Sequence, residues 1–192
     1  MISLEGVSKA YRTRSGRRTV LDNVNVTFES GYNFGVLGVN GAGIGFGGTF
    51  HGALSGRENV AFIARIYGAG MRGVLEYVEG FCELGNYFYM PVNTYSAGMR
   101  ARLAFATCLA LDFDLYLIDE VTEVGDQHFR RKCAEAFRER MQDSDIILVT
   151  HNIHTLRQYC DRGAILDKGE LTLFDDIGTA LGRYHRMVQE RL

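Results

Sequence analysis

The chain has 192 residues, of which 46% are hydrophobic and 23% are charged, a composition typical of one globular domain. Its formal net charge of −2 excludes the global basic field of a nucleic-acid-binding protein, so no nucleic-acid partner is expected. The sequence has no apolar run of about 18 residues and no signal-peptide layout at its start, which predicts a cytosolic protein that reaches a membrane only through a partner.

Four cysteines are present, and none of them forms a CxxC pair. They are Cys82, Cys108, Cys133 and Cys160. This spacing favours free thiols in a reducing compartment over disulfides or a zinc site.

The first thirty residues have the pattern of strands and turns. Apolar and polar residues alternate from Val20 to Phe28, which predicts a strand with one buried face. A short apolar run from Asn33 to Leu37 predicts a second strand, and a glycine-rich stretch follows it.

The pattern becomes helical from Arg57 onward. Val60, Ile63, Ala64 and Tyr67 would share one face of a first helix. Further helices are expected over residues 71–84 and from about Ser96 to residue 110.

Short apolar strands and helices alternate in the second half. Strands are predicted at 115–118 and 146–149, helices at 127–142, 153–160 and 177–192, and a hairpin at 164–174. This alternation predicts the α/β class, with a mostly parallel sheet covered on both sides and an antiparallel piece at the N-terminus.

Two carboxylates follow the apolar strand that begins at Leu115. In open α/β sheets, ligands bind at the carboxyl ends of central strands. Asp119 is suited to hold Mg²⁺, and Glu120 is suited to polarise an attacking water. The alternative is a strand that simply ends in solvent with two acidic residues.

The glycines after the second strand fit part of a phosphate-binding loop. Gly38 and Gly43 match the GxxxxGK[ST] pattern, but Ile44 and Gly45 stand where lysine and a hydroxyl residue belong. A plain glycine turn is the alternative. An overlapping GxGxxG match at 43–48 is weak, because it neither follows a strand directly nor precedes a good helix start.

Two further positions could contact an anion. Ser96 is a good N-cap for the helix that follows it, and Gly98 would let an anion approach that helix end. His151 directly follows a predicted strand and could contact a phosphate or a catalytic water. Ordinary helix capping and a structural histidine are the alternatives, and His128, His154 and His185 are given only the structural interpretation.

Together these motifs resemble the ATP-binding cassette (ABC) ATPases, in the order of that family. Residues 38–43 resemble the start of Walker A, 96–99 the signature motif, and 115–120 Walker B with the catalytic glutamate. Residues 124–126 resemble the D-loop, and His151 the switch histidine. Tyr11 resembles the aromatic residue that stacks on adenine.

A narrower resemblance covers nearly the whole chain. The stretches 52–60, 94–100 and 119–126 are similar to ATPase subunits that export capsular and related bacterial polysaccharides. This resemblance implies a P-loop NTPase-like ABC core as a single domain over 1–192, with a helical lobe at approximately 57–110. It also implies a separate integral membrane permease and a peripheral location on the cytoplasmic face of the inner membrane.

The resemblance further implies an ATPase in which two copies of the chain enclose two ATP molecules with Mg²⁺. Catalysis would fall to Glu120 and His151, and metal binding to Asp119. The implied nucleotide contacts are Tyr11, Gly38, Asn40, Gly41, Gly43, His51, Ser96, Gly98, Met99 and Asp126.

The sequence departs from this family after Gly43. Residues 44–50 already resemble the approach to the Q-loop, and His51 stands at the place of its glutamine. One βα unit of roughly 30 residues is therefore expected to be missing. Weak nucleotide binding and little hydrolysis would follow, because phosphoryl transfer depends on charge neutralisation. A degenerate relative that docks on a membrane partner without hydrolysing ATP is the alternative, and a soluble ABC protein of repair or translation type is a third.

Overall fold

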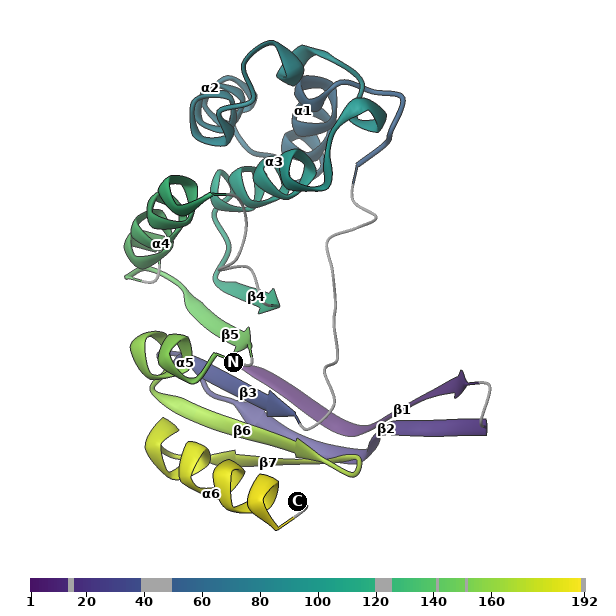
Figure 1. Ribbon diagram of the computed structural model, residues 1–192, viewed down its shortest axis with the longest axis vertical. Coiled ribbons are helices and arrows are strands. Elements are labelled where there is room, and N and C mark those ends of the chain that lie inside the picture. The colour runs from purple at the N-terminus through teal and green to yellow at the C-terminus, as the bar shows by residue number, and fades with distance from the viewer. Residues whose placement is uncertain (14–15, 39–49, 120–125, 141, 151, 191–192) are drawn as a thin grey trace. The chain divides into compact units, whose positions relative to one another are not determined.

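The computed structural model describes residues 1–13, 16–38, 50–119, 126–140, 142–150 and 152–190 (Figure 1). The chain divides into two compact units. The first comprises Met1–Gly43, Leu115–Glu120 and Ser144–Leu192, and the second comprises Ile44–Asp114 and Val121–Asp143.

A five-stranded sheet forms the centre of the first unit, with the order β4-β5-β3-β6-β7. Its strands are β3 (Phe34–Gly38), β4 (Leu115–Asp119), β5 (Asp145–Val149), β6 (Arg162–Asp167) and β7 (Glu170–Phe174). Strands β4, β5, β3 and β6 are parallel, and β7 is antiparallel to β6. The predicted mostly parallel sheet and the predicted C-terminal hairpin are both confirmed.

An antiparallel pair, β1 (Ile2–Thr13) and β2 (Gly16–Phe28), confirms the predicted N-terminal piece. It packs on one face of the sheet, where the rings of Phe28 and Phe34 meet edge to face with centroids 5.0 Å apart. From Val24 to Phe28 the alternation reflects this packing, since Val24 and Phe28 are buried and Val26 is half-buried. The residues between them, Asn25 and Thr27, are exposed.

Two helices, α5 (Ile153–Tyr159) and α6 (Ile177–Gln189), pack against β3 and β6. Gly35 and Gly163 are paired in register across these strands. A Cβ atom on Gly35 would lie 2.6 Å from Leu156, and one on Gly163 would lie 2.2 Å from the Cβ of Ala180. The two glycines therefore permit the close approach of the helices.

We predict that Gly163→Ala lowers the free energy of unfolding by about 1–3 kcal/mol, because neither Cβ can rotate away from the clash. Urea denaturation measures the change. Gly182→Ala is the matched control, since an added Cβ there meets no described atom within 4 Å. This change should not destabilise the protein, because alanine reduces the conformational entropy of the unfolded chain. A Gly163→Ala protein as stable as the wild type would contradict the tight packing of α6.

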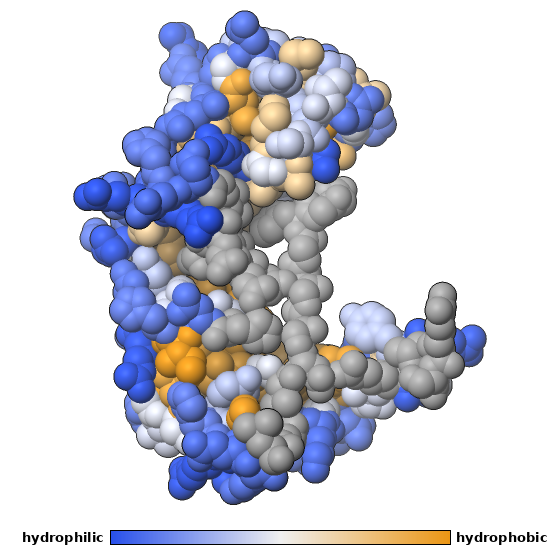
Figure 2. All heavy atoms as spheres, viewed as in Figure 1, coloured by the Kyte–Doolittle hydropathy of each residue, from blue (hydrophilic) through white to orange (hydrophobic). Residues whose placement is uncertain are grey.

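The second unit is helical. Its helices are α1 (Gly56–Ile66), α2 (Met71–Cys82), α3 (Ala97–Leu109) and α4 (Gln127–Arg140), with short 3-10 turns η1 (Gly85–Tyr89) and η2 (Val92–Thr94). Their apolar faces meet in one core that includes Val60, Val78, Phe88, Leu103 and Phe129. Helix α4 buries a residue every four positions and leaves its charged residues outside, which gives the hydrophilic surface over α4 in Figure 2.

Three details differ from the sequence-based expectation. Tyr67 lies beyond the end of α1 and is 60% exposed, so it does not share the buried face. Helix α2 ends at Cys82, because Glu83 takes a left-handed conformation with φ 52° that stops the helix. Strand β4 was expected to be central and buried, yet among the described strands it lies at the sheet edge, with Leu117 62% exposed.

All four cysteines are free thiols, as the sequence predicted. Burial raises the pKa of Cys108 to about 11 and the pKa of Cys133 and Cys160 to about 12, so these thiols stay protonated. None of the helices in the described part of the chain is long and apolar enough to cross a membrane.

Candidate functional site

The carboxyl ends of three parallel strands meet at one edge of the sheet in the first unit. Val149 of β5 is paired in register with Val36 of β3 on one side and with Asp119 of β4 on the other. Gly38 lies two residues beyond Val36, at the end of β3. Two of the predicted site residues, Gly38 and Asp119, therefore lie at the same edge, which is where open α/β sheets bind ligands.

Five predicted site residues lie outside the described residues. Three are loop positions that follow β3 in the sequence, and two are the predicted catalytic residues, which follow β4 and β5. They are Asn40, Gly41, Gly43, Glu120 and His151. Described residues adjoin only the two catalytic positions. Glu120 follows Asp119 directly, and His151 lies between Thr150 and Asn152.

The described residues on either side of position 151 are joined by side-chain hydrogen bonds that the sequence analysis did not single out. The hydroxyl of buried Thr150 accepts a hydrogen bond from the Asn152 N–H at 3.1 Å. Asn152 in turn caps α5, accepting from the N–H groups of His154 and Thr155 at 3.0 and 3.2 Å. A polar Thr-x-Asn sequence after an apolar strand was the available signal for this cap.

Tyr11 lies on β1 in the same unit. Its side chain is 57% exposed, and the ammonium of Lys9 lies 5.2 Å from the ring centroid. An exposed aromatic face of this kind is available for stacking, and the neighbouring cation is attracted to the ring quadrupole.

The signature-like residues begin α3 in the second unit. Ser96 is the N-cap, and its hydroxyl accepts a hydrogen bond from the N–H of Met99 at 3.2 Å. Ser96, Ala97 and Gly98 are all exposed. A Cβ on Gly98 would meet, among the described atoms, only the Ser96 hydroxyl at 3.9 Å, so packing within the chain does not require glycine there.

His51 is exposed, and its backbone is fixed by Asn59, a residue that the sequence analysis passed over. The His51 N–H donates to the Asn59 side-chain oxygen at 2.7 Å, and the Asn59 amide donates back to the His51 carbonyl at 3.1 Å. The same amide bonds the carbonyls of Leu54 and Ser55. The Asn59 side chain is only 3% exposed, and a buried amide needs partners, but no local sequence pattern marked it.

Asp126, another predicted site residue, directly precedes α4. One carboxylate oxygen accepts from the Phe129 N–H at 2.9 Å, and the other accepts from Arg102 at 2.8 Å. The Phe129 N–H and the positive charge of Arg102 lower the pKa of this carboxyl group. Gly38, Asp119 and Tyr11 thus belong to the first unit, whereas His51, Ser96, Gly98, Met99 and Asp126 belong to the second.

No model of a known protein family matches the chain. The chain is 42% identical over 215 residues to the capsule polysaccharide export ATP-binding protein CtrD of Neisseria meningitidis serogroup B, covering 97% of this chain and 100% of CtrD. It is 39% identical over 217 residues to the polysialic acid transport ATP-binding protein KpsT of Escherichia coli, covering 97% of this chain and 99% of KpsT.

A solved dimeric bacterial ABC transporter cassette superposes with a TM-score of 0.73 at 20% identity, over 91% of this chain and 98% of that chain. The fold is therefore that of an ABC cassette. Because the chain is 42% identical to CtrD and 39% identical to KpsT over nearly its full length, it belongs to the ATP-binding proteins of capsule polysaccharide and polysialic acid export. The resemblance read from the motifs is confirmed.

Both relatives contain internal residues that have no counterpart in this chain. The alignments extend over 215 and 217 residues and include nearly all of both partners, whereas this chain has only 192 residues. This difference in length agrees with the expectation that one βα unit is missing from the chain.

A comparison of the helix caps Ser96 and Ser55 tests how much Ser96 contributes to the stability of the fold. Ser96→Ala should lower the free energy of unfolding by about 1 kcal/mol, because it removes one exposed cap bond. Ser55→Ala should lower it more, since buried Ser55 exchanges bonds with Glu58 at 2.7, 2.8 and 3.2 Å in a capping box. Urea denaturation of both variants measures the order, and a larger loss at Ser96 would show that its main role is structural.

Proposed function

We propose that this chain is the ATP-binding subunit of a polysaccharide exporter, coupling ATP binding and hydrolysis to export across a bacterial inner membrane. The observation that carries the proposal is the shared edge of β3, β5 and β4, because it brings the Walker A-like and Walker B-like strand ends together. The names of CtrD and KpsT, at 42% and 39% identity, support export of a capsular or related polysaccharide.

In this proposal the first unit holds the nucleotide. The backbone N–H groups of residues 38–43 surround the phosphates, since such groups form anion-binding cradles after a strand. Asn40, Gly41 and Gly43 belong to this cradle, and Tyr11 stacks on adenine. The exposed ring of Tyr11 and the place of Gly38 at the strand end support these roles.

Asp119 would help to hold Mg²⁺, Glu120 would direct water at the terminal phosphate, and His151 would stabilise the transferring group. The fit is good for magnesium in particular, because Mg²⁺ in such sites needs only one or two carboxylates in addition to phosphate oxygens. Asp119 would supply one such carboxylate, and its backbone lies at the sheet edge that it shares with Gly38.

A second copy of the chain would complete the site. The N-terminus of α3 carries a partial positive charge, exposed Ser96 and a glycine whose missing side chain leaves open space. Ser96, Gly98 and Met99 would contact the nucleotide of the partner copy, with Asp126 and His51 nearby in the assembled pair. Two solved structures of one cassette with this fold superpose at TM-scores of 0.73 and 0.70, and both are described as dimeric, the second bound to ADP and phosphate.

The membrane partner would be a separate integral permease, which holds the pair at the cytoplasmic face of the inner membrane. Closure of the two copies on ATP and reopening after hydrolysis would move the permease between conformations. This arrangement is supported by the names of the relatives, since CtrD is described as an export ATP-binding protein and KpsT as a transport ATP-binding protein.

The shortened loop predicts weak activity. Because Ile44 and Gly45 occupy the places of the phosphate-binding lysine and its hydroxyl neighbour, we expect the purified chain to bind Mg-ATP weakly and to hydrolyse it slowly. Replacing residues 44–50 by the corresponding, longer CtrD segment should raise both ATP affinity and turnover. Glu120→Gln in this chimaera should abolish turnover, and a chimaera that neither binds nor hydrolyses ATP would contradict the proposed function.

Gly98→Asp tests the partner-facing role of α3. The new carboxylate should leave the free energy of unfolding within about 0.5 kcal/mol of the wild type, because acidic residues suit the first turn of a helix. It should abolish Mg-ATP-dependent dimerisation of the chimaera, measured by sedimentation velocity, because it meets the phosphates with negative charge. Gly73→Asp, also exposed in the first turn of a helix with open space around it, should dimerise normally.

A further inference from the structure

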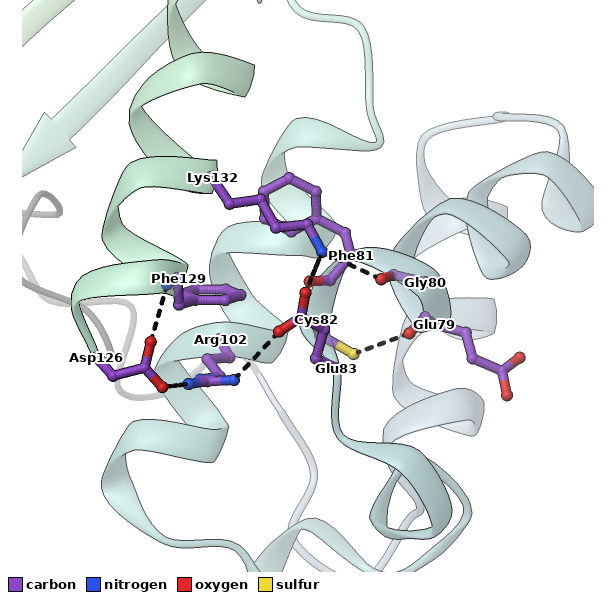
Figure 3. A network of polar contacts seen from close by, with 9 residues as sticks. All are labelled: Glu79, Gly80, Phe81, Cys82, Glu83, Arg102, Asp126, Phe129 and Lys132. Atoms are coloured by element: carbon purple, nitrogen blue, oxygen red, sulfur yellow. Dashed lines mark hydrogen bonds and ion pairs between the residues drawn. The ribbon is translucent and has the colours of Figure 1, made fainter.

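Four charged side chains join three helices of the second unit in one network (Figure 3). Arg102 of α3 binds Asp126 at 2.8 Å and lies 3.8 Å from Glu83, the residue that ends α2. Lys132 of α4 binds the other oxygen of Glu83 at 2.6 Å. The network therefore connects the end of α2, the middle of α3 and the start of α4.

The guanidinium of Arg102 is largely withdrawn from water. Its side chain is 19% exposed, and it lies 4.4 Å from the centroid of the Phe129 ring, which is fully buried. Only arginine can stack its planar group on a ring while the same group donates in two directions. These contacts fix the direction in which Arg102 presents its hydrogen bonds.

Asp126 uses both carboxylate oxygens within the chain. One oxygen caps α4 through the Phe129 N–H, and the other accepts from Arg102. The Phe129 N–H lowers the pKa of this carboxyl group most, and the charges of Arg102 and nearby His128 add to the effect. The orientation of the carboxylate therefore depends on α3 as well as on α4.

Glu83 supports Arg102 from the opposite side. Its left-handed backbone turns its side chain toward α3 and α4, where Lys132 also donates to the carbonyls of Gly80 and Phe81 at 3.3 and 3.0 Å. The last carbonyls of α2 and the carboxylate of Glu83 thus share one cation. This cation holds Glu83 in place beside Arg102.

We propose that Arg102 is a positioning residue that fixes the start of α4, at Asp126, against α3, the helix that Ser96 begins. The inference rests on the proposed function, in which Ser96 and Asp126 both face the nucleotide site completed by a partner copy. Arg102 lies on the same helix as Ser96, so a rigid α3 sets the spacing between these two contacts. Loss of Arg102 would leave each contact intact and make their spacing variable.

Arg102→Gln in the CtrD-segment chimaera tests the proposal. We expect the pKa of Asp126, followed by carbon NMR of the carboxyl group, to rise toward the ordinary aspartate value. We also expect Mg-ATP-dependent dimerisation to weaken by roughly ten- to a hundredfold, since small misplacements of contact groups have effects of this size. The NMR measurement on the unmodified chain should give the same rise in pKa.

Arg140→Gln is the matched control, because Arg140 joins the other ends of the same two helices. It binds Asp112 and the carbonyl of Leu109, and does not contact Asp126. We expect this variant to lose stability while the pKa of Asp126 and the ATP-dependent dimerisation stay at wild-type values. If Arg140→Gln weakened dimerisation as much as Arg102→Gln, general loosening of α3 and α4 would explain the effect and the positioning role would be wrong.

Two further outcomes separate this inference from the proposed function. If Arg102→Gln leaves the pKa of Asp126 unchanged, in the unmodified chain or in the chimaera, the inference is wrong regardless of the result for Mg-ATP-dependent dimerisation. A chimaera that shows no Mg-ATP-dependent dimerisation with Arg102 present contradicts the proposed ATP-enclosing pair, and the NMR titration still decides whether Arg102 holds Asp126.

Discussion

The parallel register of β3, β5 and β4 is the constraint on which the site depends. Main-chain hydrogen bonds place Val36, Val149 and Asp119 in one row, although at least one helix lies between any two of them in the sequence. Residues that follow the row must leave the sheet at the same edge. Gly38, Asp119 and the end of β5 therefore belong to one edge because of backbone pairing.

The register is supported from both faces of the sheet. Phe28 and Phe34 pack between the sheet and the N-terminal strands, and the paired glycines Gly35 and Gly163 let α6 approach β6 closely. On the β4 side the support is incomplete among the described strands, since β4 forms the edge and Leu117 is 62% exposed.

The second unit depends on a different kind of interaction. Its helices share one apolar core, but their ends are fixed by polar groups, namely the caps at Ser55 and Ser96 and the charged network around Arg102. Apolar packing tolerates small sliding movements, whereas directed hydrogen bonds to a planar guanidinium do not. The polar contacts therefore fix the positions of the starts of α3 and α4 more tightly than apolar packing alone would.

The sequence by itself determined the order of the elements, the α/β class, the caps at Ser96 and the family, because alternation, helical periodicity and motif order are all local patterns. It could not determine that β4 lies at an edge, that Tyr67 is exposed or that α2 ends at Cys82, since these depend on which neighbours are present in space. Arg102 and Asn59 went unnoticed for the same reason: in sequence they are an ordinary arginine and asparagine on helices. Only the tertiary structure joins Arg102 to Asp126 across 24 positions and Asn59 to the backbone of His51, because the partners of a buried polar group come from distant segments as readily as from near ones.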